Sequence, residues 1–219
     1  MIDPVKFDPA HFDPDALDWA KMGGLIPAIV QHATTGEVRM LGYMDRAALD
    51  ATLADRLVTF YSRSRGGPWR KGETSGNLLD LVDIRSDCDR DALRILATPR
   101  GPTCHTGSDS CFGDDGAPGV GFIATLADTV TTRAAADPAT SYTARLIGEG
   151  AKRLAQKVGE EGVEVALAAV AGDAAELTSE AADLVYHLTV LLEASDSSWD
   201  SVIAELKRRH SASKLTASS

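Results

Sequence analysis

All three cysteines of this 219-residue chain lie in one stretch, between Asp87 and Cys111. Fifteen residues separate Cys88 from Cys104, and six separate Cys104 from Cys111. Thiolates are ligands that zinc prefers, and a zinc ion with three protein ligands keeps a fourth position open for chemistry. The cysteines therefore predict a catalytic zinc site, with three buried structural cysteines as the alternative.

Three aspartates alternate around the first cysteine, at Asp87, Asp89 and Asp91. Carboxylate oxygens suit a hard ion such as Mg²⁺. In extended backbone the three aspartates would project to one face and Cys88 to the other. The segment therefore predicts a magnesium site beside the zinc site, and a solvated acidic turn is the alternative.

His105 follows Cys104 directly and could be a fourth zinc ligand or a general base. In an extended chain the residue beside Cys104 points away from the metal, which favours the role of a base. A hydrogen-bonded core histidine fits the sequence equally well.

A cationic segment rich in Gly, Ser and Thr precedes the cysteines. Arginine binds phosphate in bidentate fashion, and glycine lets backbone N–H groups approach closely. Trp69 offers a face on which a base could stack. We therefore expect phosphate and base binding, with an exposed hairpin loop as the alternative. The candidates are Arg63, Ser64, Arg65, Trp69, Arg70, Lys71, Gly72, Thr74, Ser75 and Gly76.

Acidic residues recur in pairs in the second half, at Glu161-x-x-Glu164 and Glu180-x-x-Asp183. On a helix, at about 100° per residue, Glu160 falls in the same arc as the first pair. Two acidic pairs on facing helices would bind magnesium, whereas charged helix faces are the alternative. An apolar stripe flanks the arc and predicts a buried face; it consists of Val163, Ala166, Leu167 and Val170.

The composition excludes several classes of partner. The net charge of −10 disfavours nucleic acid or an anionic membrane as the main partner. No apolar run approaches the roughly 18 residues of a membrane span, and no signal-peptide pattern opens the sequence. The odd number of cysteines argues against a disulfide framework. The expected compartment is the cytoplasm.

The periodicity changes along the chain from that of strands to that of helices. After a loose arm and short helix over residues 1–22, strands are predicted at 25–30, 38–43, 57–62, 78–84 and 93–97. A helix capped by Asp45 runs to about residue 54. Further helices are predicted at about 122–135, 143–157, 159–171, 174–195 and 198–209. Capping boxes are expected at Asp173 with Glu176 and at Ser197 with Asp200.

This change of period predicts two domains joined by a Gly-rich linker. We expect a β-rich α+β domain over residues 1–115, with its core at about 20–113. The linker covers residues 116–121. An all-α helical bundle then covers residues 122–219.

The first domain resembles phosphoribosyl-AMP cyclohydrolase of histidine biosynthesis over about residues 20–113. In that family the cysteines bind zinc and the aspartates bind magnesium, and an intertwined dimer draws its zinc ligands from both subunits. The resemblance implies that zinc-activated water attacks C6 of the adenine and opens the N1–C6 bond, with His105 moving protons. His32 departs from the acid expected there in many relatives. The resemblance is carried by residues 24–31, 62–65, 69–76, 87–91 and 104–112.

The second domain resembles phosphoribosyl-ATP pyrophosphohydrolase, a relative of the all-α MazG-type nucleotide pyrophosphatases. The acidic pairs carry this resemblance, together with residues 141–144 and 152–164. It implies hydrolysis of the α–β phosphoanhydride of phosphoribosyl-ATP, with Glu161 or Glu164 orienting or deprotonating the water. The implied magnesium ligands are Glu160, Glu161, Glu164, Glu180 and Asp183.

Together these features predict a bifunctional, homodimeric hydrolase that acts on phosphoribosyl nucleotides with Zn²⁺ and Mg²⁺ as cofactors. One alternative is a general nucleoside triphosphate pyrophosphatase fused to a structural zinc module. Another is a non-catalytic, metal-dependent assembly protein.

Overall fold

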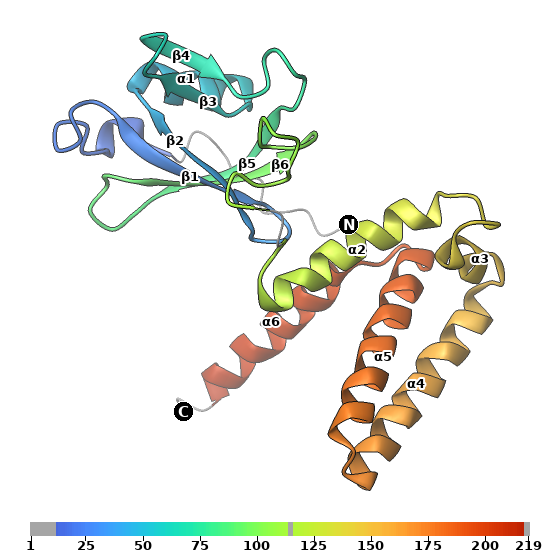
Figure 1. Cartoon of the computed structure of the whole chain (residues 1–219). Coiled ribbons are helices and arrows are strands. Elements are labelled where there is room, and N and C mark those ends of the chain that lie inside the picture. Colours follow the sequence, from blue (N-terminus) through green and yellow to red (C-terminus); the bar gives the residue numbers. More distant parts are fainter. Residues whose placement is uncertain (1–11, 114–115, 217–219) are drawn as a thin grey trace. The chain divides into compact units, whose positions relative to one another are not determined.

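The structure is a computed structural model that describes residues 12–113 and 116–216, with side chains described as far as residue 211. Most of the predicted loose arm lies outside the described residues, and a short 3₁₀ helix, η2 (Pro14–Ala16), follows it. The chain divides into two compact units, one ending at Phe122 and the other beginning at Ile123. The first is β-rich and the second is helical, which confirms the predicted fold class (Figure 1).

The larger sheet of the first unit has the strand order β2-β1-β6-β5. Strand β1 runs antiparallel to β2 and parallel to β6, which is antiparallel to β5. Alternation decides which side is buried: Ile26, Ala28 and Val30 are fully buried, whereas Ile29 is 39% exposed. The strands are β1 (Ile26–His32), β2 (Val38–Met44), β5 (Leu79–Ser86) and β6 (Leu93–Pro99).

A helix and a two-stranded sheet complete this unit: α1 (Arg46–Asp55), β3 (Thr59–Ser62) and β4 (Gly67–Arg70). Asp45 caps α1 as predicted, because its side chain accepts a hydrogen bond from Ala48 N at 2.8 Å. The buried Thr52 hydroxyl accepts from Thr59 N at 2.9 Å and so ties the helix to β3.

The second unit is built around a helical hairpin of α4 and α5, which lie side by side (Figure 1). Gly172 ends α4 in the left-handed conformation, and Asp173 caps α5 as predicted by accepting from Glu176 N at 3.0 Å. The core of this second unit contains Val130, Leu146, Leu154 and Val190. The helices are α2 (Phe122–Ala134), α3 (Tyr142–Gly148), α4 (Ala151–Ala171), α5 (Ala174–Ala194) and α6 (Trp199–Thr216). No helix in the described part of the chain is long and apolar enough to span a membrane.

Several predicted boundaries were wrong. The helix break lies at Gly150, which has a φ of +89°, instead of near residue 158, so 151–171 forms one continuous helix. Ser198, not Ser197, caps α6, since its hydroxyl accepts from Ser201 N at 3.3 Å. Strand β4 (Gly67–Arg70) lies in a segment for which the sequence analysis predicts no strand.

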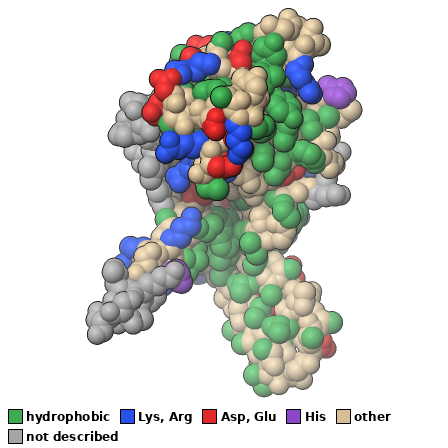
Figure 2. All heavy atoms as spheres, turned by 90° about the vertical axis from the view of Figure 1, so that its left-hand side faces the viewer, with side chains coloured by type: hydrophobic (Ala, Val, Ile, Leu, Met, Phe, Trp, Pro, Cys, Tyr) green, Lys and Arg blue, Asp and Glu red, His purple; other side chains and the backbone are tan. Residues whose placement is uncertain are grey.

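The apolar stripe on α4 is also not buried as predicted. Val163 is 59% exposed, Leu167 63% and Val170 89%. Figure 2 shows hydrophobic side chains on the surface of the lowest lobe, which is the α4–α5 hairpin. The apolar periodicity is therefore real, but within one chain it faces solvent.

Candidate functional site

The three alternating aspartates converge at the β5–β6 turn. One carboxylate oxygen from each of Asp87, Asp89 and Asp91 lies within 4.8 Å of the other two, which is close enough to hold a metal ion. Asp87 Oδ1 accepts hydrogen bonds from Asp91 N at 3.0 Å and Ala92 N at 3.1 Å. The convergence therefore arises from a turn and not from the extended backbone that the alternation argument requires.

Two of the three thiols also lie together. Cys104 and Cys111 interact directly, and each affects the pKa of the other. Hydrogen bonds, led by Thr106 Oγ1 at 3.1 Å from Cys104 Sγ, lower the pKa of Cys104 to about 6. Desolvation, followed by the neighbouring Cys104, raises the pKa of Cys111. The pair therefore presents one ready thiolate at neutral pH.

Cys88 does not join this pair within one chain. Among the described residues, the clusters that could hold a metal contain carboxylates only, so the three thiols do not lie within 4.8 Å of one another. Cys88 is exposed in the turn that carries the aspartates. A zinc site that uses all three cysteines would therefore need one of them from a second copy of the chain.

His105 lies next to the thiol pair. Its Nδ1 is 3.8 Å from Cys104 Sγ, and the side chain is exposed. The segment turns here, because Gly107 N donates to Cys104 O at 3.1 Å. The geometry therefore places the ring near the sulfur rather than pointing away from it.

Lys71 is buried beside both thiols and is 8% exposed. Its Nζ donates to Asn77 O at 3.2 Å, and burial lowers its pKa. Gly72 makes this packing possible: it has a φ of +82°, and a Cβ there would lie 2.2 Å from Asn77 O. Of the cationic segment, Lys71 thus lies beside the thiols, and Gly72 allows the close contact with Asn77.

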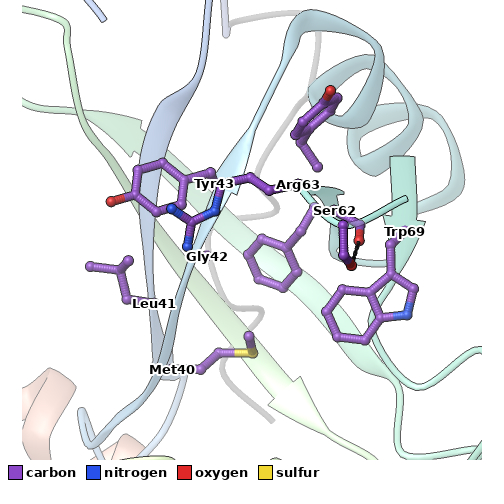
Figure 3. A pocket seen from close by; sticks show the side chains of 10 residues that line it. Met40, Leu41, Gly42, Tyr43, Ser62, Arg63 and Trp69 are labelled. Atoms are coloured by element: carbon purple, nitrogen blue, oxygen red, sulfur yellow. Dashed lines mark hydrogen bonds between the residues drawn. The ribbon is translucent and has the colours of Figure 1, made fainter. Parts of the chain in front are cut away.

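A pocket of about 450 Å³ lies between β2 and the β3–β4 hairpin. Arg63 Cζ stands 5.1 Å from the centre of the Tyr43 ring, a cation–π contact, and Trp69 lies on the other side of the pocket (Figure 3). The pocket combines aromatic faces with a guanidinium and can hold a base and a phosphate. Its lining consists of Met40, Leu41, Gly42, Tyr43, Phe60, Tyr61, Ser62, Arg63, Ser64 and Trp69.

The other candidates of the cationic segment do not line this pocket. Arg65 pairs with Glu73, and Arg70 pairs with Asp55. The remaining positions, Thr74, Ser75 and Gly76, lie in an exposed loop that closes through Gly76 N to Gly72 O at 2.9 Å.

In the second unit three of the four paired acids converge between α4 and α5, and the predicted ligand Asp183 is not part of this cluster. Carboxylate oxygens of Glu161, Glu164 and Glu180 lie within 4.8 Å of one another. Desolvation, followed by the charges of these neighbours and Asp183, raises the pKa of Glu180. Such mutual repulsion is what a bound divalent cation would relieve.

Glu160 is directed elsewhere. Its carboxylate accepts from Gln156 Nε2 at 2.7 Å and Lys157 Nζ at 3.2 Å. Sharing an arc with Glu161 and Glu164 therefore does not bring it into the cluster of ligand atoms.

The buried Glu161 is held by two basic groups. Lys157 Nζ is 2.8 Å from Glu161 Oε1, and His187 Nδ1 is 3.5 Å from the same oxygen. His187 Nδ1 also lies 2.9 Å from Asp183 O, while its buried Nε2 has no hydrogen-bond partner among the described residues. The bond to Lys157 is the main reason that the pKa of Glu161 is lowered.

Sequence reasoning missed Lys21 and the β2–β3 side of the pocket. The lysine pairs with Asp89 and Asp91, and the only signal for it was a single positive charge before Gly23-Gly24. For Tyr43 and Tyr61 the signal was an aromatic side chain near the end of a predicted strand.

Comparison with known proteins matches each unit to a family. Residues 40–113 match the family model of phosphoribosyl-AMP cyclohydrolase, and residues 123–210 match that of phosphoribosyl-ATP pyrophosphohydrolase. The histidine biosynthesis bifunctional protein HisIE of Escherichia coli (strain K12) is 56% identical over 194 residues, 89% of this chain and 95% of that protein. HisIE of Pasteurella multocida (strain Pm70) is 53% identical over 197 residues, 89% of this chain and 98% of that protein.

The similarity extends over both units, since the matched 89% of the chain exceeds either family region. The chain therefore belongs to the family of bifunctional histidine biosynthesis enzymes, hydrolases that combine phosphoribosyl-AMP cyclohydrolase with phosphoribosyl-ATP pyrophosphohydrolase.

Proposed function

We propose that the two units catalyse consecutive hydrolytic steps. The C-terminal unit converts phosphoribosyl-ATP to phosphoribosyl-AMP and pyrophosphate, and the N-terminal unit then opens the adenine ring at N1–C6. The supporting observation is that each unit contains a cluster of carboxylates that could hold a metal ion. Each cluster lies inside the region that matches the corresponding family. The order of the units is thus the reverse of the order of the reactions.

We propose that Cys104 and Cys111 hold zinc together with the partner subunit's Cys88. The donor set fits, since soft thiols lie side by side and one has its pKa lowered to about 6. Bound zinc would supply hydroxide at neutral pH, because it lowers the pKa of water to about 7. The thiols must stay reduced, which agrees with the predicted cytoplasmic location.

The other side chains of the N-terminal unit are proposed to bind and orient the substrate. Trp69 and Tyr43 offer faces for the base, and Arg63 offers a guanidinium for phosphate. His105, exposed beside Cys104, would carry protons between solvent and the reacting ring. The roles of Asp87, Asp89 and Asp91 are those of magnesium ligands.

We propose that Glu161, Glu164, Glu180 and Asp183 form the magnesium site of the C-terminal unit. Bound Mg²⁺ would neutralise the phosphate charge of the substrate. Glu164 is exposed and is the better candidate to orient the attacking water, because Glu161 is already engaged by Lys157 and His187. Glu160 is proposed to act indirectly, by holding Lys157.

We further propose that the enzyme is a homodimer. The thiols of one chain do not form a three-cysteine cluster among the described residues, and the stripe on α4 leaves large apolar side chains in solvent. A second copy would supply the missing thiol and cover the stripe. Dimer dissociation is then expected to release zinc, measurable by native mass spectrometry with metal analysis. A monomer that keeps stoichiometric zinc would contradict the shared site.

Two variants of the purified full-length protein, supplied with zinc and magnesium, test the two reactions separately. Cys104→Ala should abolish ring opening and leave pyrophosphate release from phosphoribosyl-ATP intact. Glu164→Gln should abolish pyrophosphate release and leave the ring opening of supplied phosphoribosyl-AMP intact. Mass spectrometry of the nucleotides follows both steps. Hydrolysis of ordinary nucleoside triphosphates without ring opening of phosphoribosyl-AMP would instead support the general pyrophosphatase.

A further inference from the structure

A lysine from outside the β5–β6 turn reaches into its carboxylate cluster. Lys21 Nζ lies 2.6 Å from Asp89 Oδ2 and also pairs with Asp91. Both carboxylates belong to the cluster that could hold a metal ion. A cation of this chain therefore contacts two of the three carboxylates that a divalent ion would use.

The backbone holds this lysine in place. We call residues 12–24 the strap, and its Asp18 N donates to Arg90 O in the middle of the turn at 2.8 Å. Asp18 Oδ1 in turn accepts from Lys21 N at 3.0 Å. Leu17 anchors the strap in the core, where it is 6% exposed. Lys21 is thus tethered next to the aspartates rather than meeting them as a free surface side chain.

We propose that Lys21 is a tethered competing cation that sets the divalent-metal affinity of the Asp87/Asp89/Asp91 cluster and releases the end of the strap when a metal binds. The inference rests on the proposed magnesium site. An ammonium group can only donate hydrogen bonds, so it occupies carboxylate oxygens that a metal would need. Two cations on the same carboxylates also repel each other.

Removing the charge of Lys21 should have opposite effects on metal binding, depending on whether Lys21 competes with the metal or supports the aspartates. If Lys21 competes, Lys21→Gln should tighten metal binding, by about fivefold for an exposed ion pair. If Lys21 instead only holds the aspartates together, the same substitution should weaken binding. The sign of the change therefore separates the two roles.

The experiment measures Mn²⁺ binding to the full-length, zinc-loaded protein by electron paramagnetic resonance. The background carries Glu164→Gln and Glu180→Gln, so that the signal reports the N-terminal cluster. In this background Lys21→Gln should bind Mn²⁺ about fivefold more tightly, while Lys21→Arg, which keeps the charge, should stay near the parent. Lys207→Gln, which removes an exposed lysine on α6, is the matched control and should change nothing.

A second measurement needs no substitution. Hydrogen exchange of the peptide that contains Lys21 should become faster when Mg²⁺ is added to the parent protein, and it should respond less in Lys21→Gln. Unchanged or weaker Mn²⁺ binding by Lys21→Gln would overturn the proposal that Lys21 competes with the metal. Hydrogen exchange of the strap that does not change when Mg²⁺ is added would overturn it as well. Failure of every variant to bind Mn²⁺ at this cluster overturns the magnesium site itself and the inference with it.

Discussion

A buried carboxylate needs a nearby cation, and Glu161 has one in Lys157. The Glu161 side chain is 6% exposed, so its charge is largely shielded from water, and the ammonium group at 2.8 Å replaces that solvation. His187 contacts the same oxygen from the neighbouring helix. The negative charge of Glu161 is therefore balanced by protein groups, while Glu164 is exposed and Glu180 is half-buried.

We expect Lys157→Met to destabilise the helical unit in a pH-dependent way. Lys157 lowers the pKa of Glu161, so the stabilisation is present above the normal pKa of 4.5 and is lost as the pH falls through the folded-state value. In the presence of a metal chelator, the free energy of unfolding should fall by about 2 kcal/mol at pH 7, and this loss should shrink below pH 4.5.

Urea unfolding followed by helical circular dichroism measures this loss. Lys207→Met, on an exposed position of α6, serves as the control. An equal loss at pH 4 and pH 7 would show that the aliphatic part of Lys157, not its charge, carries the stabilisation.

The reactivity of Cys104 should depend on Thr106. The Thr106 hydroxyl is the leading cause that lowers the pKa of this thiol to about 6, so most of it is thiolate at neutral pH. In zinc-free protein, alkylation of Cys104 by iodoacetamide should have its midpoint near pH 6. Thr106→Val should move that midpoint upward, and Thr106→Ser should not. Peptide mass spectrometry reads the labelled fraction, and coincident midpoints for all three proteins would rule out the hydroxyl.

Residue types and spacing identified most of the candidate ligands but not their geometry. The convergence of Asp87, Asp89 and Asp91 comes from side chain-to-backbone bonds in a turn, which a count of alternating positions cannot reveal. Lys21 was missed because its contact with Asp89 spans 68 residues of sequence. Local patterns carry no information about contacts of that range.

At the scale of elements, capping residues and periodicity were the reliable signals. Asp45 and Asp173 begin their helices as predicted. The false break near Gly159 arose because glycine disfavours a helix interior, yet here it stays helical in a hairpin whose partner helix supplies tertiary contacts. Strand β4 was missed because its start, Gly67-Pro68, has the composition of a turn.

The contact of β2 with β3 gives a prediction at this scale. A Cβ at Gly42 would lie 2.3 Å from the ring of Phe60, which is 2% exposed and cannot move aside easily. Gly42→Ala should therefore cost about 1–3 kcal/mol and raise the KM of ring opening, because both residues line the pocket.

Gly67→Ala is the matched control, since a Cβ there meets nothing within 4 Å. Thermal unfolding and steady-state kinetics compare the two variants. A Gly42→Ala protein with the KM and stability of the control would mean that β2 and β3 can move apart at no cost in free energy.

At the scale of the whole molecule, two units with different secondary structure each carry a cluster of chemically suitable ligands. This division was readable from sequence, because the period of apolar residues changes from 2 to 3.6 between them. The exposure of the α4 stripe was not readable. An amphipathic pattern shows that a face is apolar, but not whether the same chain or another one covers it.

A charge on this stripe should therefore disrupt a dimer rather than the fold. Leu167 is 63% exposed, so Leu167→Glu leaves the core of one chain unchanged while it places a carboxylate in the proposed interface. We expect a shift toward monomer in light scattering, and helical circular dichroism close to that of the parent. Val120→Glu, at a position 86% exposed near the start of α2, is the control and should stay dimeric. A Leu167→Glu protein that remains a dimer at low micromolar concentration would place the partner on another surface.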